Sequence, residues 1–369
     1  MTCKVAWYCD ALTGFGHVAR AFQLHTGLVA QGGFESRLIC SPPPLVSMSV
    51  PPGAVLTPSL PRYPSRKDEL ESSIAIMKRR ITLITSFLSD WQPDFLVVDH
   101  FYSGIGGELL ALLDLVDRAG NMKLVAGVPY IENIWVPKEG NMKQLELFKK
   151  YNLALGYNEH SFDPVLDNLP MFPKLMKRRY VGVPVPTPYP SPPCQEANAP
   201  RRVVVLCGSG VHRNVSAFLQ QIVTACRSLL HKGAIQLCLV AGSIETFSFL
   251  SNDEQRDIVI QPEGKAEEYM TRADIIVARC GYNTAYTVVQ GMAPVIFSPR
   301  PGNGLEQIIR ARKLAQLERV WNVDQEQRNF TEKLEQALRE ALAAPLGIRP
   351  LPFRTNAPER VAMFFRELI

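Results

Sequence analysis

The chain has 369 residues, of which 46% are hydrophobic and 20% charged, with a formal net charge of +5. This length is more than one ordinary core needs and favours two domains, and the composition is typical of a globular protein. The mild positive charge includes no Lys/Arg block interleaved with aromatic residues, which argues against nucleic acid and fits an anionic small ligand better.

No apolar stretch reaches the roughly 18 residues that cross a bilayer, and the apolar run at the N-terminus is too short for a signal peptide. The eight cysteines are scattered and form no C-x-x-C pair. In a chain of this size that pattern indicates reduced thiols in place of a disulfide or zinc framework. We therefore expect a cytoplasmic protein, with peripheral association at a membrane as the alternative.

Short apolar runs alternate with helical patterns in the first half of the chain. Six strands are predicted, at residues 3–9, 36–40, 54–58, 95–99, 123–128 and 153–157. Helices are expected to begin near His17, Ser65 and Gly104.

One of these helices carries a basic cluster. From Leu70 to Leu88 apolar residues recur at helical spacing, and Lys78, Arg79 and Arg80 lie off that apolar face. We expect the three cations to form a solvated helix surface. Contact with a membrane or an anionic partner is the alternative.

Residues 183–202 are dense in proline, which neither a sheet nor a helix accepts, so this segment is predicted to be an extended linker. Beyond it the alternation resumes. Strand-forming runs lie at residues 201–210, 235–242, 257–264, 273–281 and 294–299. Helices are expected from about Asn214, across residues 284–291, and from Leu305.

Strands that are apolar throughout and joined by helices imply parallel sheets covered on both faces. Two such sheets, each opened by a glycine-rich turn, predict an α/β fold of two Rossmann-like domains facing a cleft. The predicted divisions are an N-terminal domain at 1–182, the linker at 183–202, a C-terminal domain at 203–355, and a last helix at 356–369 that crosses back to the first domain or stays with the second.

Ligands of such sheets bind beyond the carboxyl ends of the strands, so the loops there matter most. Four loops qualify, "GFGHVAR", "VVDHFYSGIGGE", "CGSGVHRN" and the long loop that opens with "RCGYNT", and none is a full dinucleotide fingerprint or Walker loop. In "ADIIVARCGYNT" a strand, a glycine turn and a helix start would aim backbone amides at an anion such as a diphosphate. The alternative is that Asn283 and Thr284 only cap the helix.

The chain carries "GFGHVAR", "VPPGAVLTPSLPR", "QPDFLVVDHFYSGIGGEL", "RCGYNT", "GLEQIIRARKLAQL" and "APERVAMFF" in this order over nearly its whole length. In these pieces it resembles the GT-B glycosyltransferases of the group that contains the GlcNAc transferase of peptidoglycan synthesis. It is most similar to a set of bacterial predicted glycosyltransferases.

The resemblance implies a nucleotide-sugar donor, a UDP-sugar first of all, on the second domain and an acceptor against the first. By position, the donor-binding residues are Gly208, Ser209, Gly210, Gly281, Asn283, Thr284, Glu306 and Gln307. His212 and Arg213 follow the "CGSG" turn and are candidates to neutralise phosphate. The acceptor side is assigned to Gly14, Gly16 and Glu108.

The sequence departs from the resemblance at one position. The peptidoglycan enzyme and its relatives carry a glutamate that holds the ribose hydroxyls on the helix after the glycine turn, and this chain has Thr287 there. One hydroxyl does not reproduce a bidentate carboxylate. Either the ribose is held otherwise or the nucleotide differs.

Glycosyl transfer needs a base for the acceptor proton and stabilisation of the leaving diphosphate. His17, at a helix start after the first glycine turn, is one candidate base, and a histidine that only packs or caps is the alternative. Asp99 and His100 form a rival pair in which the carboxylate orients the imidazole. No D-x-D triplet stands at a strand end and no His/Asp/Glu cluster has metal spacing, so no metal is expected.

The predicted function is a biosynthetic hexosyl transfer, inverting and metal-independent, with a GlcNAc-like sugar as one option and a small-molecule or lipid-like acceptor. The nucleotide-sugar is a co-substrate, no cofactor is expected, and the chain is a monomer or homodimer that binds no nucleic acid. Two alternatives remain, namely a nucleotide-sugar hydrolase or 2-epimerase of the same fold, and a non-catalytic sugar-nucleotide-binding partner subunit.

Overall fold

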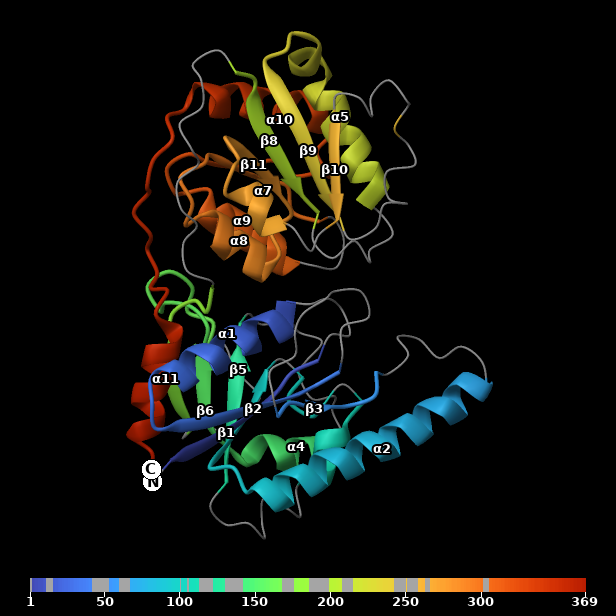
Figure 1. The fold of residues 1–369 in the computed structure, drawn as a ribbon, viewed down its shortest axis with the longest axis vertical. Helices are drawn as coiled ribbons and strands as arrows, with labels where there is room; N and C mark the ends of the chain where they lie inside the picture. The colour runs from blue at the N-terminus through green and yellow to red at the C-terminus, as the bar shows by residue number, and fades with distance from the viewer. Residues whose placement is uncertain are drawn as a thin grey trace. The chain divides into compact units, whose positions relative to one another are not determined.

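The chain folds into two compact units, Met1–Val185 with Pro352–Ile369, and Pro186–Leu351. Each unit has its own sheet and its own helices (Figure 1). The computed structural model describes residues 2–10, 16–41, 53–59, 67–99, 101–104, 106–112, 122–129, 142–167, 176–185, 199–207, 215–241, 250, 258–262, 266–300 and 305–369.

A parallel sheet of seven strands, in the order β3-β2-β1-β4-β5-β6-β7, forms the centre of the first unit as described. The strands are β1 (Cys3–Tyr8), β2 (Phe34–Cys40), β3 (Val55–Leu56), β4 (Phe95–Asp99), β5 (Lys123–Val128), β6 (Tyr151–Gly156) and β7 (Lys177–Tyr180). The strand order reverses between the neighbours β1 and β4, which pair from Val5 with Phe95 to Tyr8 with Val98. Segments that follow these two strands therefore leave the same edge of the sheet side by side.

The helices of the first unit form two groups. They are α1 (Gly16–Ala30), α2 (Lys67–Trp91), the 3-10 helix η1 (Glu108–Leu112), α4 (Met142–Lys149) and α11 (Ala357–Arg366). Helix α1 packs against α11, whereas η1 packs against both α2 and α4 (Figure 1). Alternation along β1 fits this arrangement, because Ala6 and Tyr8 belong to the same buried core as Ile84 and Leu88 of α2.

Helix α11, which follows the second unit in the chain, completes the first unit. The ring of Phe365 stacks on Phe95 of β4 with centroids 4.2 Å apart. Arg360 donates to Glu159 at 3.0 Å. A Cβ added at Gly27 would overlap the ring of Pro358, so a glycine lets α1 and α11 approach closely.

A second parallel sheet, with the order β10-β9-β8-β11-β12-β13, forms the centre of the second unit in its described part. Its strands are β8 (Arg201–Leu206), β9 (Ile235–Ala241), β10 (Ile258–Pro262), β11 (Ile275–Ala278), β12 (Val295–Phe297) and β13 (Val320–Asn322). Its helices are α5 (Val215–His231), α7 (Ala266–Met270), α8 (Tyr282–Val288), α9 (Leu305–Leu314) and α10 (Phe330–Ala343). The order reverses between β8 and β11, and α5 packs against α10 over one buried core.

The two parallel sheets confirm the predicted fold class, and every predicted strand has a counterpart. The pattern analysis did not predict β7, β13, α4, α7 or α10. The helix expected near Gly104 is the short η1, which starts at Glu108. Gly104 and Gly107 both have φ near +85°, a conformation that favours glycine and excludes a regular helix before Glu108.

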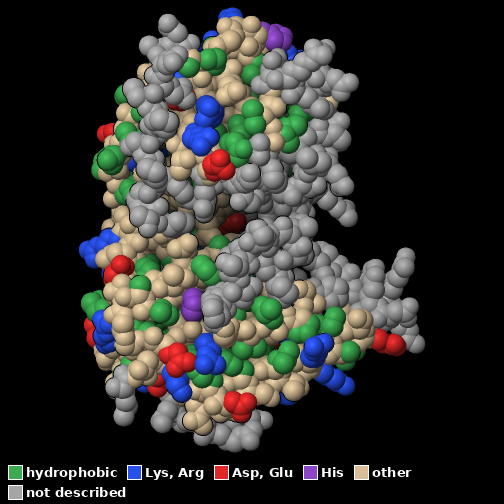
Figure 2. Space-filling model, in the orientation of Figure 1, with side chains coloured by type: hydrophobic (Ala, Val, Ile, Leu, Met, Phe, Trp, Pro, Cys, Tyr) green, Lys and Arg blue, Asp and Glu red, His purple; other side chains and the backbone are tan. Residues whose placement is uncertain are grey.

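The surface agrees with the modest net charge. On the face shown in Figure 2, the Lys/Arg and Asp/Glu side chains of the described residues lie interspersed and form no large block of one sign. Over the described residues, no helix combines the length and the apolar character that crossing a membrane requires.

Candidate functional site

Three polar side chains from α1 and β4 meet at the carboxyl edge of the first sheet. The carboxylate of Asp99, the last residue of β4, accepts from Arg20 Nε at 2.9 Å and from Arg20 Nη2 at 2.6 Å. His17 Nδ1 lies 3.3 Å from Asp99 Oδ1 and 2.8 Å from Arg20 Nη2. All three residues are buried. The structure thus brings Asp99, which the sequence analysis pairs with His100, together with His17.

Burial and pairing shift the pKa values of this cluster. Burial lowers the pKa of His17, and the positive charge of Arg20 acts in the same direction, while Asp99 opposes both. Burial alone would raise the pKa of the Asp99 carboxyl, but the Arg20 guanidinium and the contact with His17 hold that pKa below its usual value. The cluster therefore consists of a neutral imidazole, an ionised carboxylate and an arginine at neutral pH.

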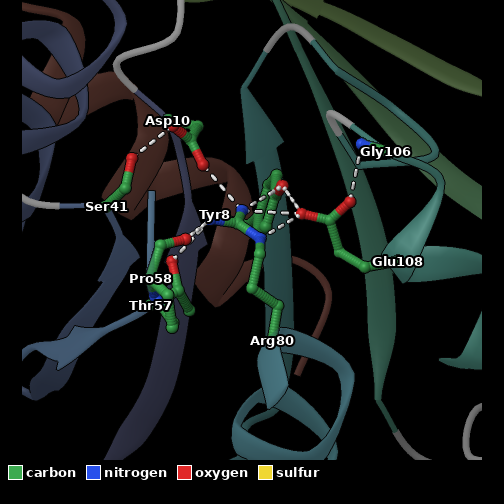
Figure 3. A network of polar contacts seen from close by, with 8 residues as sticks. All are labelled: Tyr8, Asp10, Ser41, Thr57, Pro58, Arg80, Gly106 and Glu108. Atoms are coloured by element: carbon green, nitrogen blue, oxygen red, sulfur yellow. Dashed lines mark hydrogen bonds and ion pairs between the residues drawn. The ribbon is translucent and has the colours of Figure 1, made fainter. Parts of the chain in front are cut away.

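A second buried network surrounds Arg80 of α2 (Figure 3). Arg80 Nη2 donates to Asp10 and to Glu108, each at 2.6 Å, and the Tyr8 hydroxyl donates to Glu108 at 2.6 Å. Arg80 Nη1 donates to the hydroxyl of Thr57 at 3.1 Å and to the carbonyl of Pro58 at 2.7 Å. Arg80 Nε also donates to Glu108, at 2.9 Å, so every nitrogen of the guanidinium is used within the protein.

This network fixes the starts of several loops. Asp10 follows β1 and accepts from Ser41, which follows β2, while Thr57 follows β3. Glu108 Oε2 accepts from the backbone N–H of Gly106 at 2.9 Å. The acceptor-side role of Glu108 stays a prediction; in the structure its buried carboxylate binds Arg80, the Tyr8 hydroxyl and the backbone of Gly106.

The expectation that Arg80 lies on a solvated surface is wrong. Lys78 and Arg79 are exposed, whereas Arg80 is completely buried. Ile74, which belongs to the apolar pattern between Leu70 and Leu88, is 50% exposed. The buried stripe of α2 runs through positions 80, 84, 88 and 91, at the spacing of a helix face. Hydrophobicity predicted Ile84 and Leu88 in this stripe but not Arg80, because an arginine counts as polar even where carboxylates neutralise it.

In the second unit the predicted glycine turn connects β11 to α8. Gly281 is the N-cap of α8 and makes no side-chain capping bond, so Asn283 and Thr284 lie inside the helix and the capping alternative is wrong. Both side chains are partly buried. A Cβ at Gly281 would meet no atom of the described residues beyond its chain neighbours within 4 Å, which leaves space among those residues beside the backbone of the turn.

Helix α9 is tied to this turn. Arg310 donates to the carbonyl of Cys280 at 2.6 Å and to Glu306 at 3.0 Å. Burial raises the pKa of the Glu306 carboxyl, against the opposing charge of Arg310. Gln307 accepts from the backbone N–H of Arg300 at 3.2 Å. The two residues predicted to bind sugar hydroxyls thus also hold the local structure.

Arg279, directly after β11, is a site residue that the sequence analysis did not find. Its guanidinium carbon lies 3.7 Å from the centre of the Phe218 ring, and Nη1 donates to Gln325 at 2.7 Å. The same nitrogen also approaches the carbonyls of Ser298 and Pro299 at 3.5 and 3.4 Å. Burial lowers the pKa of Arg279 to about 10. Its position after a strand beside the reversal of strand order could have drawn attention to it.

The remaining predicted residues are not all placed. Gly16 is the exposed first residue of α1, and Thr287 is buried within α8. Seven predicted residues lie outside the described part of the chain, namely Gly14, His100, Gly208, Ser209, Gly210, His212 and Arg213.

Among the described residues, no group of three or more His, Cys, Asp or Glu side chains is arranged to hold a metal ion. The cysteines placed by the structure are free and buried.

The second unit matches one known protein family. Residues 202–352 match the family described as glycosyltransferase family 28 C-terminal domain. Among curated protein sequences, none is significantly similar to the chain.

Solved structures share the fold of the whole chain. The glycotransferase of kitacinnamycin has a TM-score of 0.61 at 13% identity, over 100% of this chain and 95% of that one. Arabidopsis thaliana UGT89C1 complexed with quercetin has a TM-score of 0.64 at 15% identity, over 100% and 94%. A putative UDP-N-acetylglucosamine 2-epimerase from Listeria monocytogenes has a TM-score of 0.59 at 12% identity, over 100% and 97%. Residues 202–352 thus match a glycosyltransferase family, and the whole chain has the GT-B fold of these solved structures.

Proposed function

We propose that the protein transfers a hexose from a nucleoside-diphosphate sugar, a UDP-sugar first of all, to a hydroxyl of a small-molecule or lipid-like acceptor with inversion. The observation that carries the proposal is the buried contact between His17 and Asp99 at the carboxyl edge of the first sheet. An imidazole beside a carboxylate is the arrangement by which proteins accept a proton from a hydroxyl near neutral pH.

In the proposed reaction His17 takes the proton of the acceptor hydroxyl as its oxygen forms a bond to the anomeric carbon of the sugar. The bond from that carbon to the diphosphate breaks on the opposite face, and the electron pair stays with the diphosphate. Asp99 stabilises the imidazolium that forms, since its carboxylate lies 3.3 Å from Nδ1. Removing the acceptor proton and stabilising the leaving group are the two tasks of the site.

We assign the leaving diphosphate to the second unit. Gly281, Asn283 and Thr284 would face it, and the open space beside Gly281 leaves room for a phosphate near the backbone. Helix α8 has only seven residues, so its dipole contributes little by itself. The buried cation of Arg279, one residue after β11, supplies the positive charge that a diphosphate requires.

The nucleoside and the sugar are assigned to neighbouring positions. Glu306 and Gln307 at the start of α9 would accept hydrogen bonds from sugar hydroxyls in addition to their present partners. Thr287 offers one hydroxyl where a ribose-binding carboxylate is expected, so we propose weaker dependence on the ribose hydroxyls than a glutamate would give.

A panel of UDP-, dTDP- and GDP-sugars tests the proposal. A bound donor stabilises the folded protein by mass action, so thermal shifts identify the nucleotide first. The donor that binds is then incubated with a set of alcohol acceptors. Product formation that depends on both substrates supports transfer, and activity that survives a chelator supports the metal-independent form.

The same experiment separates the alternatives. Free nucleotide or an epimerised sugar formed without an acceptor would indicate a hydrolase or epimerase. Binding without turnover across all acceptors would indicate a partner subunit. Either result would refute transfer as the function.

A further inference from the structure

Arg20 stands between His17 and Asp99, in a position that the proposed reaction does not use. Arg20 Nη2 lies 2.8 Å from His17 Nδ1 and 2.6 Å from Asp99 Oδ1. The direct distance from His17 Nδ1 to Asp99 Oδ1 is longer, at 3.3 Å. Because His17 Nδ1 lies close to both a donor and an acceptor, the proton on Nδ1 decides which of the two contacts is a hydrogen bond. A bare Nδ1 accepts from Arg20, and a protonated Nδ1 donates to Asp99.

Arginine donates hydrogen bonds and accepts none, and it stays protonated in proteins. The short contact from Arg20 to His17 is therefore a hydrogen bond only when Nδ1 is bare and accepts. A proton on Nδ1 would face an N–H group at 2.8 Å and would have the longer contact with Asp99 as its acceptor. A neutral imidazole with a bare Nδ1 carries its proton on Nε2.

The charges around the ring favour the neutral form. Within the described residues, the charged groups that act on His17 are Asp99 on β4, Arg20 on α1 and Asp10 after β1. Both oxygens of Asp99 already accept from Arg20. Burial lowers the pKa of His17 and Arg20 lowers it further, against the two carboxylates.

We propose that Arg20 is a positioning residue that keeps His17 neutral in the resting protein, with the ring proton on Nε2. The inference rests on the proposed function, in which Nε2 must accept the acceptor proton. In the resting tautomer Nε2 donates instead. To become a base, Nε2 releases its proton to solvent water and Nδ1 takes one from solvent. Nδ1 then donates to Asp99, while Arg20 keeps its bonds to the carboxylate, so the reaction includes a tautomer exchange that Arg20 opposes.

The tautomer is measured directly in the full-length protein without substrate. Protonated and bare ring nitrogens differ in ¹⁵N chemical shift, and the signals of His17, one of six histidines, are identified by their loss in His17→Gln. At about pH 8, above the usual histidine pKa, we expect a proton on Nε2 and a bare Nδ1. A proton on Nδ1 in the wild-type protein overturns the proposal.

Arg20→Met tests the cause. Without the guanidinium, Asp99 remains as the acceptor, so the proton should move to Nδ1 and the pKa of His17 should rise by about one unit or more. The acid limb of kcat/KM should move to higher pH with it, which a purely structural role for Arg20 would not produce. Arg37→Met is the matched control, because Arg37 on β2 is a partly exposed arginine paired with Glu35 at 3.0 Å and remote in sequence from the cluster.

A folded Arg20→Met protein with an unmoved tautomer and acid limb overturns the proposal. If that variant does not fold, the wild-type measurement decides by itself. Because the tautomer is read without substrate, a protein that transfers no sugar but carries the proton on Nε2 refutes the proposed function and leaves the role of Arg20 standing.

Discussion

The two sheets treat buried charge differently at their carboxyl edges. In the first unit the buried carboxylates of Asp10, Asp99 and Glu108 are each bonded to a buried arginine. In the second unit the described partners of Arg279 are an amide oxygen, two carbonyls and an aromatic ring. Arginines thus neutralise the carboxylates at the first edge, whereas Arg279 at the second edge contacts only neutral groups among the described residues, although Arg310 and Glu306 form an ion pair nearby.

This difference agrees with the proposed roles of the two edges, namely proton transfer at the first and donor binding at the second. A buried cation that lacks an anion costs folding free energy, and a bound phosphate would recover part of that cost. The arginine–carboxylate pairs at the first edge need no bound ion to neutralise them, so we expect them to orient side chains and to set protonation states. The comparison therefore predicts effects on turnover and stability at the first edge and effects on donor affinity at the second.

Replacing His17 should give the largest effect. If His17 accepts the acceptor proton, His17→Ala should lower turnover by about 10²–10⁴-fold, the range of a positioned general base. The dissociation constant of the donor should stay unchanged, since this effect arises in the transition state. Steady-state kinetics and calorimetry measure the two quantities. A larger loss in Asp99→Asn, or weaker donor binding in His17→Ala, would contradict this division.

Arg80→Met should be the most destabilising change in the first unit. It leaves the buried carboxylates of Asp10 and Glu108 without their arginine, which typically costs about 3–5 kcal/mol. Urea denaturation measures the free energy of unfolding. The matched control is Arg79→Met, an exposed neighbour on the same helix, for which we expect a change within about 0.5 kcal/mol. Equal losses in both variants would show that the network does not hold the first edge together.

Arg279→Gln should separate donor affinity from stability. Loss of a charged hydrogen-bonding group costs about 1.5–3 kcal/mol, hence on the order of tenfold to a hundredfold in affinity for UDP measured by calorimetry. The melting temperature should hold or rise, because burial lowers the pKa of Arg279 to about 10 and thus disfavours its charged form. Arg339→Gln, at an exposed arginine of α10, is the control. An unchanged UDP affinity in Arg279→Gln would show that Arg279 does not contribute to donor binding.

Gly281→Ala sharpens the same point with a smaller change. Gly281 has a φ of −62° that alanine adopts readily, and the added methyl group would meet none of the other described residues within 4 Å. We expect an unchanged melting temperature and about a tenfold weaker donor affinity, equivalent to about 1.4 kcal/mol. Full affinity in this variant would place the diphosphate elsewhere.

The smallest effect concerns pH. The pKa values of His17 and Asp99 are both lower in the folded protein than their ordinary values of 6.5 and 3.8. The stability they contribute is complete above pH 6.5 and is lost as pH falls, first through His17 and then through Asp99. One proton taken up on unfolding gives a slope of at most about 1.4 kcal/mol per pH unit. His17→Gln should make the free energy of unfolding less dependent on pH below pH 6.5. An unchanged pH dependence in this variant would contradict a lowered pKa of His17.

The sheets could be predicted from the sequence because their strands are apolar runs beside glycine turns. The same logic fails for β7, whose sequence "KRRY" is charged because this edge strand alternates between exposed and partly buried residues. The strand pattern did place His17 and Asp99, which are 82 residues apart, at the same edge of the sheet, because the segments that follow neighbouring parallel strands lie side by side.

The buried arginines of the first unit, Arg20 and Arg80, could not be predicted to be buried from the sequence. Arg20 and Arg80 are buried because specific carboxylates from distant segments neutralise them, and a pattern of hydrophobicity contains no record of such partners. Arg20 does lie three residues after His17, hence on the same side of α1. Even so, its bidentate contact with Asp99 requires the three-dimensional structure.

The return of α11 to the first unit affects how the chain is made. Domains generally fold as units while they leave the ribosome. Residues 352–369 emerge only after the whole of the second unit, Pro186–Leu351, has been translated. Until then the Phe95 side of the first sheet lacks the ring of Phe365 that covers it. During synthesis the second unit is therefore complete before the first, although the first begins to be translated earlier.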